Sequence, residues 1–152
     1  MIEFFAEILQ KLGEELGTPL NVDKNGACLL VYKRILKVQI QNYPEKEELL
    51  LGAFLGEIVP GKFRENVFKE ALKTNSLFPN QGAFSYVKRS NELILSHLVP
   101  YEGLTSSHLS KILLELIEKA NLWYSSIQSG SLHLVAQDVR PERSDRPMFG
   151  IR

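Results

Sequence analysis

Two short apolar runs constrain this chain most, because they lack the alternation of an ordinary solvent-exposed strand. Residues 27–32 and 49–58 carry apolar side chains at both odd and even positions, and the second run includes Gly52 and Gly56. The glycines weaken a helix, so both runs are predicted to be strands. An antiparallel sheet with one wet face alternates apolar and polar residues. Either both faces of these strands are covered within the monomer, or some apolar surface is reserved for a partner.

Apolar residues recur at helical spacing in other parts of the chain. Residues 2–16 form one apolar stripe that ends at Gly17 and Pro19, which predicts a first helix. A second amphipathic helix is expected over residues 63–75, with Asn75 closing it in the left-handed conformation. A third helix is expected to start at a cap and to continue to about residue 127.

The remaining segments complete an α+β order, α-β-β-β-α-β-β-α, in which an antiparallel sheet packs with helices. Thr105 or Ser106 can cap the last helix by accepting a hydrogen bond from a free backbone N–H. The other strands are expected at residues 36–41, 83–88 and 93–98. Three helices cannot easily cover both faces of five strands, which favours a surface reserved for a partner.

The 152 residues correspond to one domain. Residues 1–128 are predicted to form it, and residues 129–152 to be a C-terminal extension that is largely flexible. Beyond residue 136 the extension is polar and lacks periodicity. Residues 137–152 are therefore expected to be dispensable for folding.

Residues that could carry chemistry are sparse and scattered. The histidines His97, His108 and His133 and the single cysteine, Cys28, match no metal-binding or nucleophile–base spacing. Cys28 is expected to be a small buried apolar residue, and His97 a partly buried, hydrogen-bonded one. The sequence thus predicts no enzyme, no catalytic residue, no metal and no cofactor.

Charged residues give no evidence for an anionic partner. The chain has 18 basic and 18 acidic residues, so its net charge is zero, which disfavours nucleic acid or an anionic membrane as partner. The pairs Lys33–Arg34 and Lys88–Arg89 are interpreted as solvated charges at strand ends or turns. No signal peptide, no bilayer-spanning run and no disulfide pair is recognised, so the expected compartment is the cytoplasm.

Several local signatures occur in an order that resembles the class I type III secretion chaperones, the CesT/SycE-like family. An amphipathic first helix leads into residues 22–26, Val-Asp-Lys-Asn-Gly, and a strand. The apolar run 49–56, Leu-Leu-Leu-Gly-Ala-Phe-Leu-Gly, closes at Val59–Pro60, and the second helix ends in residues 71–75, Ala-Leu-Lys-Thr-Asn. A strand pair then leads to Pro100 and a long final helix with Trp123 near its end. The resemblance spans roughly residues 1–128.

The resemblance implies a bacterial, cytoplasmic homodimer without catalysis. It would bind the N-terminal segments of secreted effector proteins and keep them non-globular, stable and competent for secretion. An extended segment can add a strand to a sheet edge while its apolar side chains and short helices fill grooves. The ATPase of the secretion apparatus is a further candidate partner. Two alternatives stay open: a dimeric scaffold that binds folded partners, and a small-ligand-binding α+β domain.

Two sets of residues are assigned from the resemblance. The first helix and first three strands are expected to contact the secreted partner, through Phe5, Leu9, Leu12, Leu29, Val31, Val38 and Ile40. The second helix and the strand after it are expected to form the two-fold interface, through Phe63, Val67, Phe68, Leu72, Phe84, Tyr86 and Val87. Such an isologous contact places each residue near itself or a symmetry mate across the axis.

Overall fold

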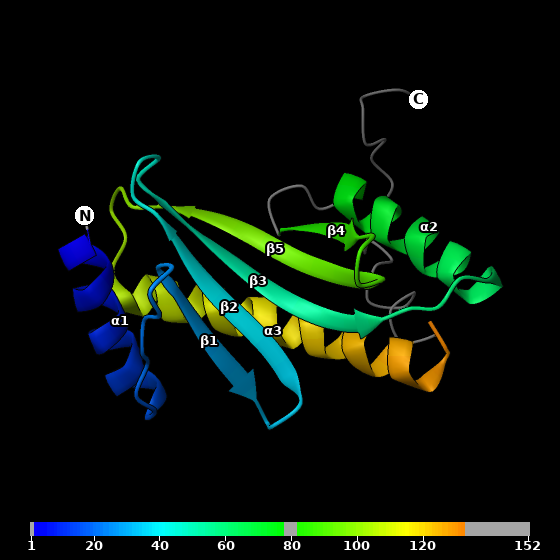
Figure 1. Ribbon diagram of the computed structural model, residues 1–152, viewed down its shortest axis with the longest axis horizontal. Helices are drawn as coiled ribbons and strands as arrows, with labels where there is room; N and C mark the ends of the chain where they lie inside the picture. The colour runs from blue at the N-terminus through cyan, green and yellow to red at the C-terminus, as the bar shows by residue number, and fades with distance from the viewer. Residues whose placement is uncertain (1, 78–81, 133–152) are drawn as a thin grey trace, which may run out of the picture.

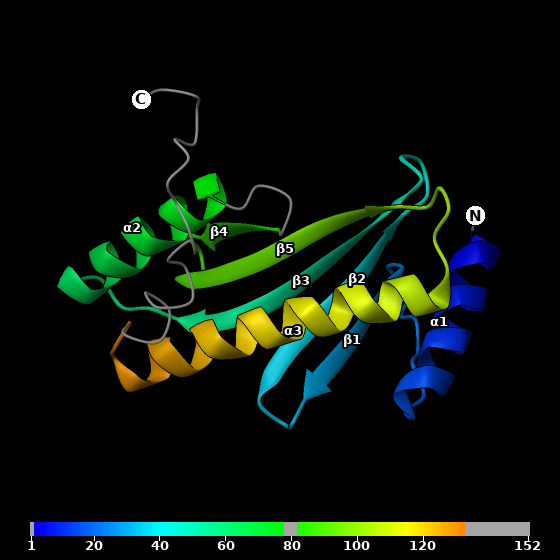
Figure 2. The same ribbon diagram turned by 180° about the vertical axis from the view of Figure 1, so that it is seen from behind.

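The computed structural model describes residues 2–77 and 82–132, and they form one twisted antiparallel sheet with three helices (Figures 1 and 2). The predicted element order is confirmed. The elements are α1 (Ile2–Leu16), β1 (Ala27–Tyr32), β2 (Leu36–Tyr43), β3 (Glu48–Glu57), α2 (Lys62–Leu77), β4 (Ala83–Val87), β5 (Glu92–Pro100) and α3 (Ser106–Ser129). The strands lie in the order β1-β2-β3-β5-β4, so β1 and β4 are the two edges.

The register of the sheet divides its residues between an inner and an outer face. Val38 of β2 pairs with Leu30 of β1 on one side and with Ala53 of β3 on the other. Residues that pair across strands share a face, and successive residues along a strand alternate between faces. Even positions of β2 therefore point inward with Val38, whereas its odd positions point outward.

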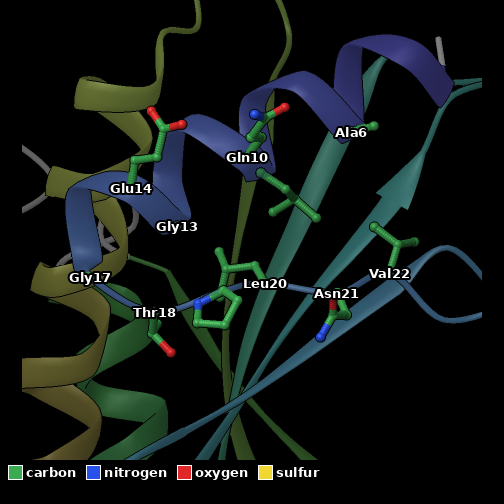
Figure 3. Close-up of a pocket in the computed structure, with 11 residues that line it drawn as sticks. Ala6, Gln10, Gly13, Glu14, Gly17, Thr18, Leu20, Asn21 and Val22 are labelled. Carbon is green, nitrogen blue, oxygen red and sulfur yellow. The ribbon is translucent and has the colours of Figure 1, made fainter.

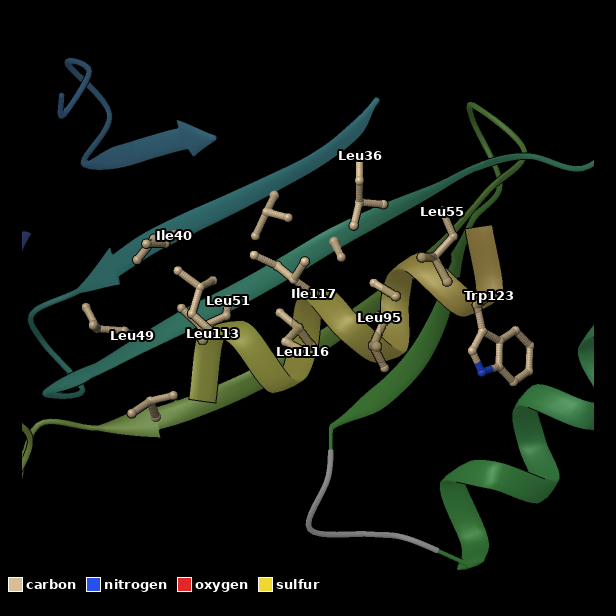
Figure 4. Close-up of a cluster of buried hydrophobic side chains, with 14 of the residues drawn as sticks. Leu36, Ile40, Leu49, Leu51, Leu55, Leu95, Leu113, Leu116, Ile117 and Trp123 are labelled. Atoms are coloured by element: carbon tan, nitrogen blue, oxygen red, sulfur yellow. The ribbon is translucent and has the colours of Figure 1, made fainter. Parts of the chain in front are cut away.

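The inner face packs against α3 and forms the hydrophobic core (Figure 4). Thr105 caps α3, because its side chain accepts a hydrogen bond from the His108 N–H at 3.1 Å. The helix ends at Gly130, whose φ of 73° is the left-handed conformation typical of a helix C-terminus. Trp123 is fully buried and packs on Phe84 of β4, with 4.2 Å between ring centroids.

The run with two glycines is β3, and Gly56 shows why a glycine is needed there. Its φ is +101°, a conformation that side chains rarely adopt, and it lies at an irregularity in the pairing of β3 with β5. A Cβ atom at Gly56 would also lie 3.2 Å from the Gln128 side chain of α3. The strand thus passes close beneath the end of α3 because this residue has no side chain.

α1 and α2 occupy opposite ends of the molecule (Figure 1). α1 packs near the start of α3, where the Ser106 hydroxyl donates to the Glu15 carboxylate at 2.7 Å and Phe4 packs on Tyr101. α2 lies beside β4. None of the three helices of the described residues covers the outer face of β1, β2 and β3, as both views show, so these helices leave sheet surface open, as expected (Figures 1 and 2).

Some expectations about boundaries are wrong. Asn75 does not close α2 in the left-handed conformation, because the helix continues to Leu77. The Asn75 amide bonds to β4 instead, so its side chain is engaged without ending the helix. β5 extends past residue 98 to Pro100. Nearly all of the predicted C-terminal extension lies outside the described residues.

Candidate protein-binding surface

The outer face of the sheet carries two apolar rows with small residues between them. One row contains Phe54 of β3 paired with Ile94 of β5, and the other contains Leu50 paired with Leu98. Between them Gly52 pairs with Ser96. Only Ile94 comes within 4 Å of the place where a Cβ of Gly52 would lie, so the space above this glycine is open.

The β1 side of this face carries exposed apolar residues. Leu29 and Val31 are 58% and 53% exposed, and Ile35, in the turn that follows, is 57% exposed. They share their face with Gln39 and Lys37 of β2, their partners in the register. Isolated exposed apolar residues are common, but a contiguous group on a sheet marks an interaction surface.

The two sheet edges differ in how their backbone groups are satisfied. At β4, the Asn75 amide donates to the Phe84 carbonyl oxygen at 3.1 Å, and the Phe84 N–H donates to the Asn75 amide oxygen at 2.7 Å. This pair of bonds is what a residue of a neighbouring strand would supply. Among the described residues β1 pairs only with β2, and it contains neither proline nor a charged residue, the usual devices that block strand addition. Asp23 bonds to both backbone groups of Ala27, the first residue of β1. The β1 edge is therefore open beyond Ala27, along Leu29 and Val31.

An apolar groove lies between α1 and the segment that leads from it to β1 (Figure 3). Its volume is about 540 Å³. Gly13 allows the chain to fold back here, because the Thr18 N–H donates to its carbonyl oxygen and a Cβ would lie only 2.8 Å from the Thr18 oxygen. Leu9, Leu20 and Val22 contribute the larger apolar side chains of the lining.

The polar network near β4 fixes the hairpin against α2. The Arg64 guanidinium donates to the Tyr86 hydroxyl at 2.7 Å, and that hydroxyl donates to the Asn91 side-chain oxygen at 2.5 Å. Arg64 also lies over the rings of Phe68 and Tyr86, 5.6 and 5.5 Å from their centroids. A planar guanidinium can bond and stack at once, so α2 and the hairpin are held as one unit.

The titratable groups of this fold show no catalytic arrangement in the described part of the chain. Burial raises the pKa of the Cys28 thiol, which favours its protonated form. Burial also lowers the pKa of His97, and the nearby Lys119 ammonium acts in the same direction while Glu115 opposes it. No group of three His, Cys, Asp or Glu side chains among the described residues could hold a metal ion.

The sequence matches the model of the Tir chaperone protein (CesT) family over residues 7–124. This is more than half of the chain. The protein belongs to the CesT family. No curated protein sequence matches the chain.

Several solved protein complexes, one of them a chaperone–effector complex, contain a chain with the fold of this CesT-family protein. The chain is 22% identical to one in the crystal structure of the ExsC–ExsE complex, with a TM-score of 0.73, covering 84% of this chain and 96% of the other. The chain is 21% identical to one in the structure of the HopA1–SchA chaperone–effector complex, with a TM-score of 0.69, covering 82% of this chain and 95% of the other. For a chain of the ExoT–SpcS complex from Pseudomonas aeruginosa the identity is 19% and the TM-score 0.59, and the match covers 80% of this chain and 97% of the other.

The seven residues expected to contact the secreted partner do not line one groove in this CesT-family fold. Leu29 and Val31 lie on the exposed outer face. The other five are buried in the core with at most 2% exposure, and they are Phe5, Leu9, Leu12, Val38 and Ile40. The period of two along a strand puts residues 29 and 31 on the face opposite residues 38 and 40, because Leu29 pairs with Gln39 and Val31 with Lys37.

The seven residues expected at the two-fold interface are also divided. Val67 is fully buried and Phe84 is 7% exposed, so both belong to the monomer core. Leu72 is 68% exposed on α2 and lines a shallow pocket of about 170 Å³ with Phe68 and Tyr86. Phe63 and Val87 are partly buried, as are Phe68 and Tyr86.

The sequence pattern missed two features of this surface. The sequence predicts that Asn75 ends the helix, whereas its side chain bonds to the β4 edge. The sequence predicts that Lys33 and Arg34 are solvated charges, and the structure adds that both adopt positive φ angles, 50° and 64°. Neither feature has a signal in periodicity, because each depends on backbone geometry.

No helix within the described residues is long and apolar enough to span a bilayer.

Proposed function

We propose that this CesT-family protein is a type III secretion chaperone that binds the N-terminal segments of secreted effector proteins and keeps them non-globular. The observation that carries the proposal is the open β1 edge beside the exposed outer face, where Leu29 and Val31 are more than half exposed. An extended segment that pairs with β1 gains main-chain hydrogen bonds, and its alternate side chains reach this face.

The two apolar rows of the outer face are spaced to bind a short helix of the same partner. Leu50 and Phe54 are four residues apart on β3, so the rows are separated by roughly 13 Å at ~3.3 Å per residue. An α-helix with its side chains is about 10–12 Å across. An amphipathic helix laid over Gly52 would thus touch both rows with one apolar face.

Binding of this kind needs neither catalysis nor nucleotide. The partner loses conformational entropy when it is ordered, and a large wrapped surface offsets that cost. We also propose that the protein acts as a cytoplasmic homodimer through α2 and β4, where Leu72 is exposed next to an apolar pocket. The secretion ATPase is the proposed receiver of the loaded chaperone.

The test begins with secreted proteins that co-purify with this protein from its native cell. The isolated, unfolded N-terminal fragment of each is then labelled and titrated by fluorescence anisotropy. The variant Leu29→Glu/Val31→Glu should bind at least about tenfold more weakly, a loss of ~1.4 kcal/mol, with its melting temperature unchanged.

Leu114→Glu is the matched control, because Leu114 is 48% exposed but lies on α3 away from the outer face. It should bind like wild type. Equal binding by all three proteins would contradict the placement of the partner on this face. If only folded, full-length partners bind, the protein is a scaffold and not a chaperone. Light scattering that gives a monomer mass at micromolar concentration would refute the homodimer.

A further inference from the structure

The tip of the β1–β2 hairpin carries three cations beside the exposed apolar residues of the outer face. Lys33, Arg34 and Lys37 are all exposed, and no acidic residue occurs between residues 27 and 41. Among the residues that the structure describes, none of the three forms an ion pair, and the Lys33 ammonium lies over the Tyr32 ring, 5.4 Å from its centroid. The protein is neutral overall, so this positive patch is local.

The backbone of this tip is strained, which ordinary surface charges do not require. Lys33 and Arg34 have φ angles of 50° and 64°, and the Ile35 N–H donates to the Tyr32 carbonyl oxygen at 3.0 Å. Two successive positive φ angles define a turn that favours Asn-Gly. A side chain in the left-handed conformation is disfavoured, and such strain is characteristic of functional positions.

The same dipeptide occurs in the other hairpin without strain. Lys88 and Arg89 lie in the β4–β5 turn, and neither has a positive φ, since Asn91 takes the left-handed position there. Lys88 and Arg89 can therefore be accommodated at no backbone cost. Among the described residues, only the β1–β2 tip places two cations at successive positive φ angles, a conformation that side chains disfavour.

Given the proposed function, we infer that the segment bound along β1 carries acidic residues next to its apolar anchors, and that Lys33, Arg34 and Lys37 pair with them. Val31 and Lys37 are partners in the register on the outer face, so an apolar contact and a positive charge lie side by side. Complementary charge at the rim of an apolar interface sets register and partner choice. The patch thus selects acidic, apolar segments over neutral ones.

The experiment selects binders from a displayed library of random 16-residue peptides, with the wild-type protein as bait. The enriched peptides should combine apolar residues with Asp or Glu. The variant Lys33→Asn/Arg34→Gly should bind the selected acidic peptides about tenfold more weakly. Its melting temperature should rise by about 3 °C or more, because the turn is relaxed. A gain in stability with a loss of binding cannot result from misfolding.

Lys88→Asn/Arg89→Gly removes the same charges from the other hairpin and should leave the selected peptides bound as by wild type. Apolar peptides without acidic enrichment would overturn the inference and leave the proposed function standing. The same loss of binding in both double variants would also overturn it, because the effect would then come from net charge. If no peptide is enriched at all, the proposed function fails as well.

Discussion

The two edge strands of the sheet are built from similar apolar residues, yet the sides on which they have no neighbouring strand differ. β1 and β4 both lack charged residues and proline. β4 is covered by α2, and Asn75 bonds to both backbone groups of Phe84. At β1, Asp23 bonds to both backbone groups of Ala27, but this cover ends at the first residue of the strand, and the side chains of Leu29 and Val31 further along β1 are exposed. An edge strand is therefore available for pairing because its neighbours leave it open, and not because of its own sequence.

The difference also separates two kinds of surface on this CesT-family protein. The α2–β4 end is tied together by the bonds among Arg64, Tyr86 and Asn91 and presents one exposed leucine, Leu72. Such a rigid surface suits contact with a second folded copy. The β1 end presents backbone groups and separate apolar side chains, which suits an extended segment.

The largest expected effect comes from opening the closed edge. Asn75→Ala removes both bonds to Phe84 and leaves its N–H and C=O without partners, so the free energy of unfolding should fall by ~1–3 kcal/mol. Urea unfolding measures this, with Asn66→Ala, an exposed residue of the same helix, as control. If both variants unfold alike, Asn75 does not close the β4 edge.

A smaller effect is expected from closing the open edge. Val31→Glu places a negative charge on β1, and it should lower affinity for an effector N-terminal fragment about tenfold while stability changes by less than ~0.5 kcal/mol. Ala83→Glu makes the same kind of change on β4 and should leave the affinity unaltered. Anisotropy titrations of both variants decide this. Equal losses would mean that the two edges do not differ in function.

The smallest expected effect is a pH dependence of the free energy of unfolding that comes from His97, near the closed β4 edge. His97 lies on β5 one residue beyond Ser96, where the pairing with β4 ends. Because burial lowers its pKa below the ordinary 6.5, the unfolded chain binds a proton that the folded protein does not. The stability should therefore fall as the pH drops below 6.5, by well under about 1 kcal/mol since solvent screens a partly exposed imidazole.

Urea unfolding at pH 7.5 and 5.5 measures this change. His97→Gln should flatten it, whereas His108→Gln serves as the control for loss of a histidine from exposed surface. If His97→Gln loses as much stability between pH 7.5 and 5.5 as the wild type does, other groups account for the pH dependence.

The fold could be predicted because its signals are local. The helical stripe of α1, the alternation in β2 and the cap at Thr105 each depend on neighbouring residues, and all three elements form as expected. The surface could not be predicted in the same way. Leu9 and Val31 are both apolar residues of the N-terminal half, yet Leu9 is 1% exposed and Val31 is 53% exposed.

By itself, the sequence determined the order of helices and strands, the α+β class and the excess of apolar strand surface over what three helices can cover. The tertiary structure decided which residues form that surface. Pairing of Val31 with Lys37 and of Val38 with Leu30 assigns opposite faces to residues of equal hydrophobicity. Asn75 and α2 cover β4 at Phe84, whereas Asp23 covers β1 only at its first residue, Ala27, so the rest of the β1 edge stays open. Periodicity specifies that a strand has two faces, whereas only packing against α3 specifies which face is buried.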